Sequence, residues 1–181
     1  MKHTLSAVFK NVRLRPVREE DLEPLRLWRC DEKATKYLTK IDHITPKKQR
    51  EWFESDNANQ HCYTFAIEET QTLKRMVGSV ALYNIDGFFA NFGRFLIGDL
   101  EARGKGIGSL GTILCLYIGF TELGLKTVTA HVHEENTAAI KAYEKGGFAV
   151  TGEHLCTSVG KELEIAVKRD KFLELHNYLH I

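Results

Sequence analysis

Three glycines on alternate positions, Gly104, Gly106 and Gly108, lie beside two cations, Arg103 and Lys105. Glycine lets the backbone turn with its N–H groups converging on one point. The apolar helical pattern that follows would place a helix N-terminus, with its partial positive charge, at that same point. The pattern therefore predicts an anion site with phosphate as the natural ligand. A plain glycine turn ahead of a core helix is the alternative.

Two familiar phosphate-binding loops do not fit this stretch. A Walker loop requires GxxxxGK[ST], whereas Lys105 directly follows the first glycine and no Lys-Ser/Thr pair opens the helix. A dinucleotide fingerprint requires a third glycine where Ser109 stands. That fingerprint also usually opens a βαβ unit near the start of a domain, whereas this loop follows several predicted strands.

The elements that must position the loop are predicted from hydrophobic periodicity. We expect a strand over 11–17, a helix over 18–30, and a second helix that begins at Pro46 with Thr45 as its N-cap. Further strands are predicted at 61–69, 75–86, 90–99, 126–135, 148–155 and 161–169, and further helices at 107–123, 136–145 and 170–179. This order describes an α/β fold with a mixed sheet, within a single domain over residues 1–181.

Composition limits the classes of function. With 43% hydrophobic and 27% charged residues, the chain can bury a core. Because 25 Lys plus Arg balance 24 Asp plus Glu, there is no overall charge to favour nucleic acid or a membrane surface. The four cysteines are widely spaced without a CxxC pair, which favours reduced thiols and no metal. No signal peptide or membrane-spanning run is apparent, so we expect a cytoplasmic protein.

Two motifs carry a resemblance to a known family. RGKGIG, residues 103–108, resembles the [QR]xxGxG/A acetyl-CoA signature of the GNAT superfamily of N-acetyltransferases. ENTAAIKAYEKGGF, residues 135–148, resembles the second motif of that superfamily, NxxAxxxYxKxGF. The matching positions of the second motif are Asn136, Ala139, Tyr143, Lys145, Gly147 and Phe148. The opening RLRPVREEDLEPL is typical of the branch that contains ribosomal-protein, polyamine and amino-sugar acetyltransferases.

The resemblance implies the GNAT fold, a mostly antiparallel sheet that is splayed at the acetyl-CoA site and flanked by helices. It implies acetyl-CoA as cosubstrate, with the pyrophosphate bound at Arg103, Gly104, Lys105, Gly106, Ile107, Gly108 and Ser109. It also implies backbone contacts from Leu96, Ile97 and Gly98 on the strand before the loop, where an N–H group would stabilise the oxyanion. For Lys105, a solvated loop lysine is the alternative.

Asn136 and Tyr143 lie seven residues apart, about two helical turns, and therefore share a helix face. The motif places both beside the cofactor, and a phenol remains protonated at neutral pH. We therefore expect Tyr143 to be the general acid for the leaving thiolate. A buried core tyrosine is the alternative, and Asn136 also suits a helix N-cap.

The base that deprotonates the amine is left open. Many GNAT enzymes carry a Glu early in the strand before the loop, where this chain has Asn91 followed by Arg94. The remaining candidates are Glu68, Glu69, His131, His133 and Glu134. The two histidines point to one face of a strand, and without a third ligand a solvated pair is favoured over a metal site.

The acceptor is expected to be an amino sugar or a protein N-terminus. By the resemblance, the acceptor site is built mostly by residues 27–53, where lysines outnumber acids: Lys33, Lys36, Lys40, Lys47 and Lys48. This balance disfavours a polycation such as spermidine, although lysines that simply face water are the alternative. A polyamine acetyltransferase and a non-catalytic acyl-CoA-binding module remain alternatives. The resemblance also allows a homodimer.

Overall fold

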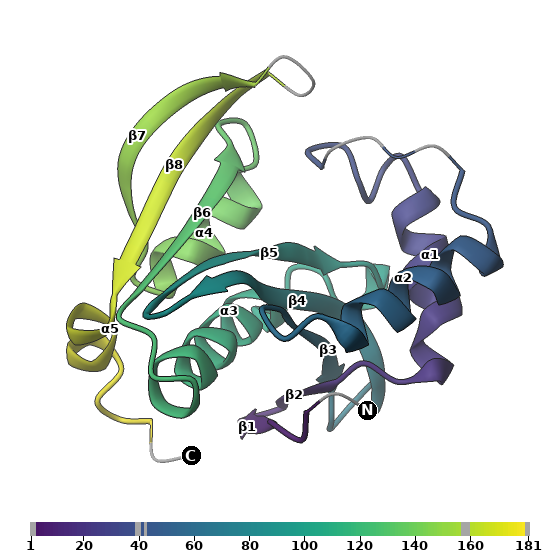
Figure 1. Ribbon diagram of the computed structural model, residues 1–181, viewed down its shortest axis with the longest axis horizontal. Helices are drawn as coiled ribbons and strands as arrows, with labels where there is room; N and C mark the ends of the chain where they lie inside the picture. Colours follow the sequence, from purple (N-terminus) through teal and green to yellow (C-terminus); the bar gives the residue numbers. More distant parts are fainter. Residues whose placement is uncertain (1–2, 39–40, 42, 157–159, 180–181) are drawn as a thin grey trace.

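The computed structural model describes residues 3–38, 41, 43–156 and 160–179. The strands within these residues form one eight-stranded sheet in the order β1-β2-β3-β4-β5-β6-β8-β7 (Figure 1). The strands are β1 Ala7–Phe9, β2 Val12–Pro16, β3 Tyr63–Glu69, β4 Arg75–Asp86, β5 Phe89–Ile97, β6 Thr127–His133, β7 Ala149–Cys156 and β8 Gly160–Lys168. Neighbouring strands are antiparallel except for the parallel pair of β5 and β6. The predicted mixed α/β fold is confirmed.

The helices flank this sheet. They are α1 Leu22–Cys30, α2 Pro46–Ala58, α3 Ile107–Tyr117, α4 Thr137–Lys145 and α5 Arg169–Leu175. A 3-10 turn, Glu19–Asp21, precedes α1, another, Leu100–Ala102, follows β5, and a π-helical turn, Ile118–Glu122, extends α3. Within the described part of the chain, no helix has both the length and the apolar character needed to cross a bilayer.

Two apolar clusters lie on opposite faces of the sheet because side chains alternate along a strand. In β3, Phe65 and Ile67 belong to the main core, where Ile67 approaches Gly111 of α3. Ala66, between them, packs instead with Leu22 and Leu25 of α1. Figure 1 shows α1 and α2 together at one end of the sheet and α5 at the other. The helix pair α1 and α2 therefore covers the face opposite α3.

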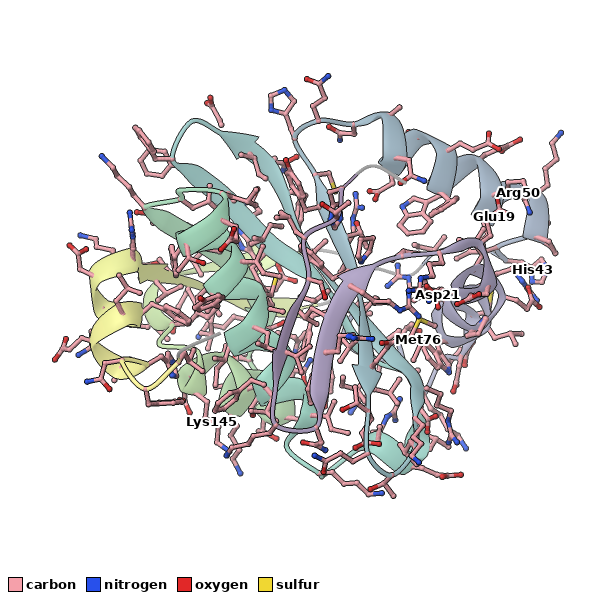
Figure 2. All side chains as sticks on the ribbon, turned by 90° about the horizontal axis from the view of Figure 1, so that it is seen from below. Glu19, Asp21, His43, Arg50, Met76 and Lys145 are labelled. Carbon is pink, nitrogen blue, oxygen red and sulfur yellow. The ribbon has the colours of Figure 1, made fainter. Side chains whose placement is uncertain are left out.

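The start of α1 is fixed by buried charges. Asp21 accepts hydrogen bonds from Arg15 Nη1 at 2.6 Å and Nη2 at 2.9 Å, and from the Arg18 backbone N–H at 2.7 Å. Figure 2 shows Asp21 further inward than Glu19 and Arg50, which lie beside each other near the molecule's edge. There Arg50 Nη1 is 3.6 Å from Glu19 Oε2. The buried pair therefore ties the beginning of α1 to β2.

The sheet splays between β5 and β6. The two strands pair only from Phe89 to Asn91 on β5, opposite Thr127 to Thr129 on β6. At the last pair, Asn91 Nδ2 donates a hydrogen bond to Thr129 Oγ1 at 2.8 Å. Beyond it the strands diverge, and Figure 1 shows β6 and β8 leading away from β4 and β5. The splay predicted from the family resemblance is present.

A β-bulge bends β5 just after this point. Arg94 and Phe95 together oppose the single residue Val80 of β4, and Arg94 has a φ of +49°. Ser79 Oγ of β4 donates a hydrogen bond to the Arg94 carbonyl at 3.1 Å. Because a bulge bends its strand, it turns the end of β5 away from β6 and leaves that edge of β5 without a strand partner.

Several predicted elements agree in detail. Thr45 caps α2 by accepting a hydrogen bond from the Lys48 N–H at 3.2 Å, and Asn136 caps α4 by accepting one from the Ala139 N–H at 3.2 Å. The strand β1 was not predicted. It is only three residues long, too short to show an alternating pattern.

Candidate active site

A cavity of about 1330 Å³ lies where β5 and β6 separate. Its walls come from α1 and α2, from β4, β5 and β6, from the loop before α3, and from α4. Segments far apart in the sequence therefore meet around one space, and its volume is large enough for an extended ligand.

The glycine loop lines one part of this cavity. Gly104 and Gly106 adopt left-handed φ values of +74° and +76°, and a Cβ added to either would meet no other atom within 4 Å. Gly106 is the N-cap of α3, so the first backbone N–H groups of that helix have no partner within the helix. Arg103 is anchored beside them, since its Nε donates to the Ile97 carbonyl at 3.0 Å. The loop thus presents open backbone donors to the cavity, the arrangement that suits a phosphate.

Most of the residues predicted from the sequence share this cavity. Those that line it are Leu96, Ile97, Arg103, Gly104, Gly106, Ile107, Gly108, Ser109, Asn136 and Tyr143. Gly98 does not line it. A Cβ on Gly98 would lie 2.0 Å from the Trp28 ring, so this glycine allows α1 to pack on the end of β5. Lys105 is exposed and does not line the cavity either. The roles of these residues in binding stay predictions.

Tyr143 lies where the cavity meets the core. The residue is only 7% exposed, and its ring packs against Phe92, Phe95 and Phe148 with centroid distances of 5.3, 5.6 and 5.7 Å. Burial, and then the proximity of Tyr83, raises the pKa of the Tyr143 hydroxyl above its ordinary value. No described residue forms a hydrogen bond with this hydroxyl. The side chain is therefore a protonated phenol that faces a cavity.

Arg94 projects from the bulge and links β5 to α2. Its Nη1 donates to Asp56 Oδ1 at 2.5 Å and to Thr64 Oγ1 at 3.2 Å. Its guanidinium lies 5.5 Å from the ring centroid of Tyr83 and 5.9 Å from that of Trp52. The bulge therefore carries a cation that is already paired with a carboxylate and covered by two aromatic rings.

Two of the candidate bases have structural partners outside the cavity. Glu68 Oε1 accepts from Arg15 Nε at 2.6 Å. Glu69 accepts backbone N–H groups of the β3–β4 turn, including that of Thr72 at 2.8 Å, and the Asn11 side-chain amide at 3.0 Å. Burial alone would raise the pKa of Glu69, but these hydrogen bonds, led by the one from Leu73, outweigh it and lower the pKa to about 2. Neither carboxylate lines the cavity.

The histidines are better placed. Both His131 and His133 line the cavity, whereas Glu134 lies outside it, 3.6 Å from Lys161 Nζ. Glu162, opposite His133 in the β6–β8 register, also lines the cavity and was missed. The alternation of acidic and apolar residues along β8 was visible in the sequence. Only the pairing of β8 with β6, however, brings Glu162 to the site. Among the described residues, no three His, Cys, Asp or Glu side chains converge as metal ligands.

The helices α1 and α2, the segment that follows α1, and β4 contribute a further group of cavity residues. Of the predicted lysines, Lys33, Lys36 and Lys48 line the cavity, Lys47 does not, and Lys40 lies outside the described residues. Arg29, Gln49, Trp52 and Tyr83 also line it and were not predicted from the sequence. Arg29, Gln49 and Trp52 fall within the segment expected to form the acceptor site, and helical spacing alone did not separate them from the surface positions.

A glycine loop at a helix N-terminus and a buried phenol lie on one cavity within a splayed mixed sheet, an arrangement that suits group transfer from a phosphate-bearing cosubstrate. The family model described as acetyltransferase (GNAT) domain matches residues 11–149, and the chain belongs to this family. Its activity is thus of the acetyl-CoA-dependent N-acetyltransferase class.

Similar proteins agree with this assignment. Spermidine N(1)-acetyltransferase from Escherichia coli (strain K12) is 29% identical over 160 residues, which cover 79% of this chain and 75% of that protein. Mycothiol acetyltransferase from Mycobacteroides abscessus is 42% identical over 57 residues, but these cover 31% of this chain and only 19% of that protein. The crystal structure of spermidine N-acetyltransferase from Vibrio cholerae in complex with CoA and spermine has a TM-score of 0.80 at 22% identity, covering 90% of this chain and 98% of that one. This last likeness shows the shared fold.

Proposed function

We propose that the protein transfers the acetyl group of acetyl-CoA to a primary amine by direct attack, with Tyr143 as general acid. The observation that carries this proposal is that Tyr143, a phenol with a raised pKa, lines the same cavity as the glycine loop. A tyrosine buried only for packing would have no need to face that space.

The glycine loop is proposed to bind the pyrophosphate of acetyl-CoA. The open backbone at Gly104 and Gly106 supports close approach of the phosphate oxygens, and Arg103 supplies a charge beside them. Asn136 uses its side-chain oxygen to cap α4, which leaves its amide N–H groups to donate to the cosubstrate. Binding of acetyl-CoA would thus span the gap between the diverging strands.

The chemistry follows from these positions. The amine attacks the thioester carbonyl carbon and a C–N bond forms, while the backbone N–H groups of β5 beyond the bulge stabilise the oxyanion. The C–S bond then breaks, and the leaving sulfur takes a proton from Tyr143. The amine loses its proton to His131 or His133, the two histidines on the cavity wall, directly or through water.

The acceptor is proposed to be a small or N-terminal amine, such as an amino sugar or a protein N-terminus. Among the described residues that line the cavity, Glu162 is the one carboxylate, against the cations Arg29, Lys33, Lys36, Lys48, Arg94, Arg103 and Lys141. Such a cavity suits a polyamine poorly. A polyamine acceptor is the second candidate, because the Escherichia coli relative is named for spermidine.

A screen that couples CoA release to a thiol reagent tests this proposal. Acetyl-CoA is offered with amino sugars, peptides with free N-termini, and polyamines at equal concentration. Release with the first two classes above that with spermidine is the expected result. Spermidine turned over far more efficiently would overturn the acceptor class, and no release with any amine would overturn the activity.

A further inference from the structure

Arg29 is a partly buried cation on the cavity wall that lacks a counterion among the described residues. It comes from α1, and no described residue forms a hydrogen bond or ion pair with its guanidinium. Burial lowers the pKa of Arg29, the neighbouring Cys30 opposes this shift, and the nearby charge of Arg94 adds to it. An arginine has five N–H donors and remains charged, so this unpaired guanidinium offers the cavity a site for an acceptor group.

Gln49, on the neighbouring helix, is a second cavity residue whose side chain has no partner among the described residues. The residue is 7% exposed, its side chain lines the same cavity, and no described residue forms a hydrogen bond with its side-chain amide. Its helix, α2, packs directly on α1. Neither the Gln49 amide nor the Arg29 guanidinium is closed off from the cavity, so both sets of N–H donors are open to a ligand that supplies oxygen atoms.

The surrounding residues decide the charge of that ligand. We call the part of the cavity lined by Leu25, Arg29, Gln49, Trp52 and Arg94 the acceptor end. Arg94 is already paired with Asp56. A polycation here would meet the unpaired charge of Arg29, whereas an anionic oxygen group would satisfy both free donors.

We infer that the acceptor end binds an anionic oxygen group of the acceptor molecule, a carboxylate or a phosphate, with Arg29 and Gln49 as its donors. This inference rests on the proposed function, because it names the class of amine that is acetylated: a primary amine that carries a negative charge. The guanidinium and the amide orient the acceptor so that its amine reaches the thioester.

Matched pairs of acceptors test whether the acceptor end prefers an amine that carries an anionic group. 4-Aminobutanoate is compared with 4-aminobutanamide, and glucosamine 6-phosphate with glucosamine, so that each pair differs in one anionic group. We expect the anionic member of at least one pair to have a KM about 10- to 100-fold lower, the range for a charged hydrogen bond. The pair that shows the preference identifies the group as carboxylate or phosphate.

Variants of Arg29 assign the preference to this residue. Arg29→Gln should remove the preference, because KM for the anionic amine rises to that of its neutral partner. Arg29→Lys should restore part of it, because the charge returns without the bidentate geometry. Lys47→Gln, the same charge change on an exposed α2 residue outside the cavity, should keep the wild-type preference.

Binding without turnover separates this inference from the proposed function. Calorimetry with the CoA-loaded protein should show tighter binding of the anionic member, lost in Arg29→Gln but not in Lys47→Gln. If no amine is acetylated while this difference persists, the proposed function fails and the anion site stands. Equal binding of both members by the wild type, or equal losses in the two variants, overturns the inference.

Discussion

The Tyr143 hydroxyl can be removed without disturbing the ring that packs against Phe92, Phe95 and Phe148. A thiolate is already an adequate leaving group. Proton donation to it should therefore raise the rate only modestly, within the roughly 10²–10⁴-fold range of general acid catalysis. Tyr143→Phe is expected to lower kcat about a hundredfold. Acetyl-CoA affinity by calorimetry and the melting temperature should change little.

The control for this variant is Tyr117→Phe, which removes a phenol hydroxyl from a residue of α3 that does not line the cavity. It should retain the wild-type kcat. A folded Tyr143→Phe protein with wild-type kcat, measured where the chemical step limits turnover, would leave Tyr143 as a core aromatic and no more.

Arg15 is a residue whose loss should affect stability rather than chemistry. It is 5% exposed and bonds to Asp21, which is 3% exposed, and to Glu68. Arg15→Met would leave a buried carboxylate without its cation, so we expect the free energy of unfolding to fall by about 3–5 kcal/mol. Urea denaturation measures this change.

Arg13→Met is the matched control. Arg13 is an exposed arginine on the same strand, with its Nη1 3.7 Å from Glu68. The loss of such a surface pair should lower the free energy of unfolding by about 1 kcal/mol or less. Equal losses in the two variants would show that the Arg15–Asp21 pair has no special role at the start of α1.

At the scale of elements, the N-terminus of α3 depends on a left-handed glycine that also lines the cavity. Gly106 and Gly124 both have left-handed φ values with open space around the Cβ position, but only Gly106 lines the cavity. Valine at either position should destabilise the fold by at least about 1 kcal/mol, because L residues disfavour this conformation. Only Gly106→Val should greatly weaken acetyl-CoA binding in calorimetry. Unchanged affinity in folded Gly106→Val would mean that the loop is not the cofactor site.

The β3–β4 turn is held by Glu69, whose folded pKa of about 2 lies below its ordinary value of 4.5. A lowered pKa gives stability that is fully present above pH 4.5 and is lost as pH falls toward 2. We therefore expect the urea midpoint of the wild type to fall across this range. Glu69→Gln should lower the midpoint at pH 6 and flatten its decline between pH 4.5 and 2. A parallel decline in both proteins would contradict this role.

The elements that were predicted well are those with a local chemical signal. Thr45 before Pro46, and Asn136 before an amphipathic helix, mark their helix starts because capping depends on a few adjacent residues. The bulge in β5 carries no such signal. Arginine at a positive φ is unusual, and Arg94 adopts it because of its position opposite β4 and its bonds to Asp56 and Thr64, which are all distant in sequence.

At the scale of the whole molecule, the cavity depends on pairings that no single segment encodes. The loop residues could be predicted because glycine spacing and helix onset lie within one short stretch. Arg29, Gln49 and Glu162 could not, because they reach the cavity only once α1, α2 and β8 have packed around the splayed strands. The sequence therefore predicts the loop that lines the cavity, but not the residues that α1, α2 and β8 bring to it.

The two parts of the sheet are joined by a short parallel ladder, from Phe89 to Asn91 on β5, and by the packing of α3 on α4. A cosubstrate bound to the loop of α3 and to Asn136 of α4 would add contacts across this junction. Ligand that binds only the folded state at a hundred times its Kd raises the free energy of unfolding by about 2.7 kcal/mol. We expect that gain for acetyl-CoA.

Hydrogen exchange in the presence of acetyl-CoA shows which segments the bound cosubstrate stabilises. Slower exchange is expected in both 103–109 and 136–143, while 12–16 of β2, which do not line the cavity, should change no more than global stabilisation requires. Gly106→Val should lose both the local protection and the stability gain. Tyr143→Phe should keep them, because its hydroxyl acts on the leaving sulfur and contributes little to binding. Protection confined to one of the two segments would show that the ligand does not bridge the splayed strands.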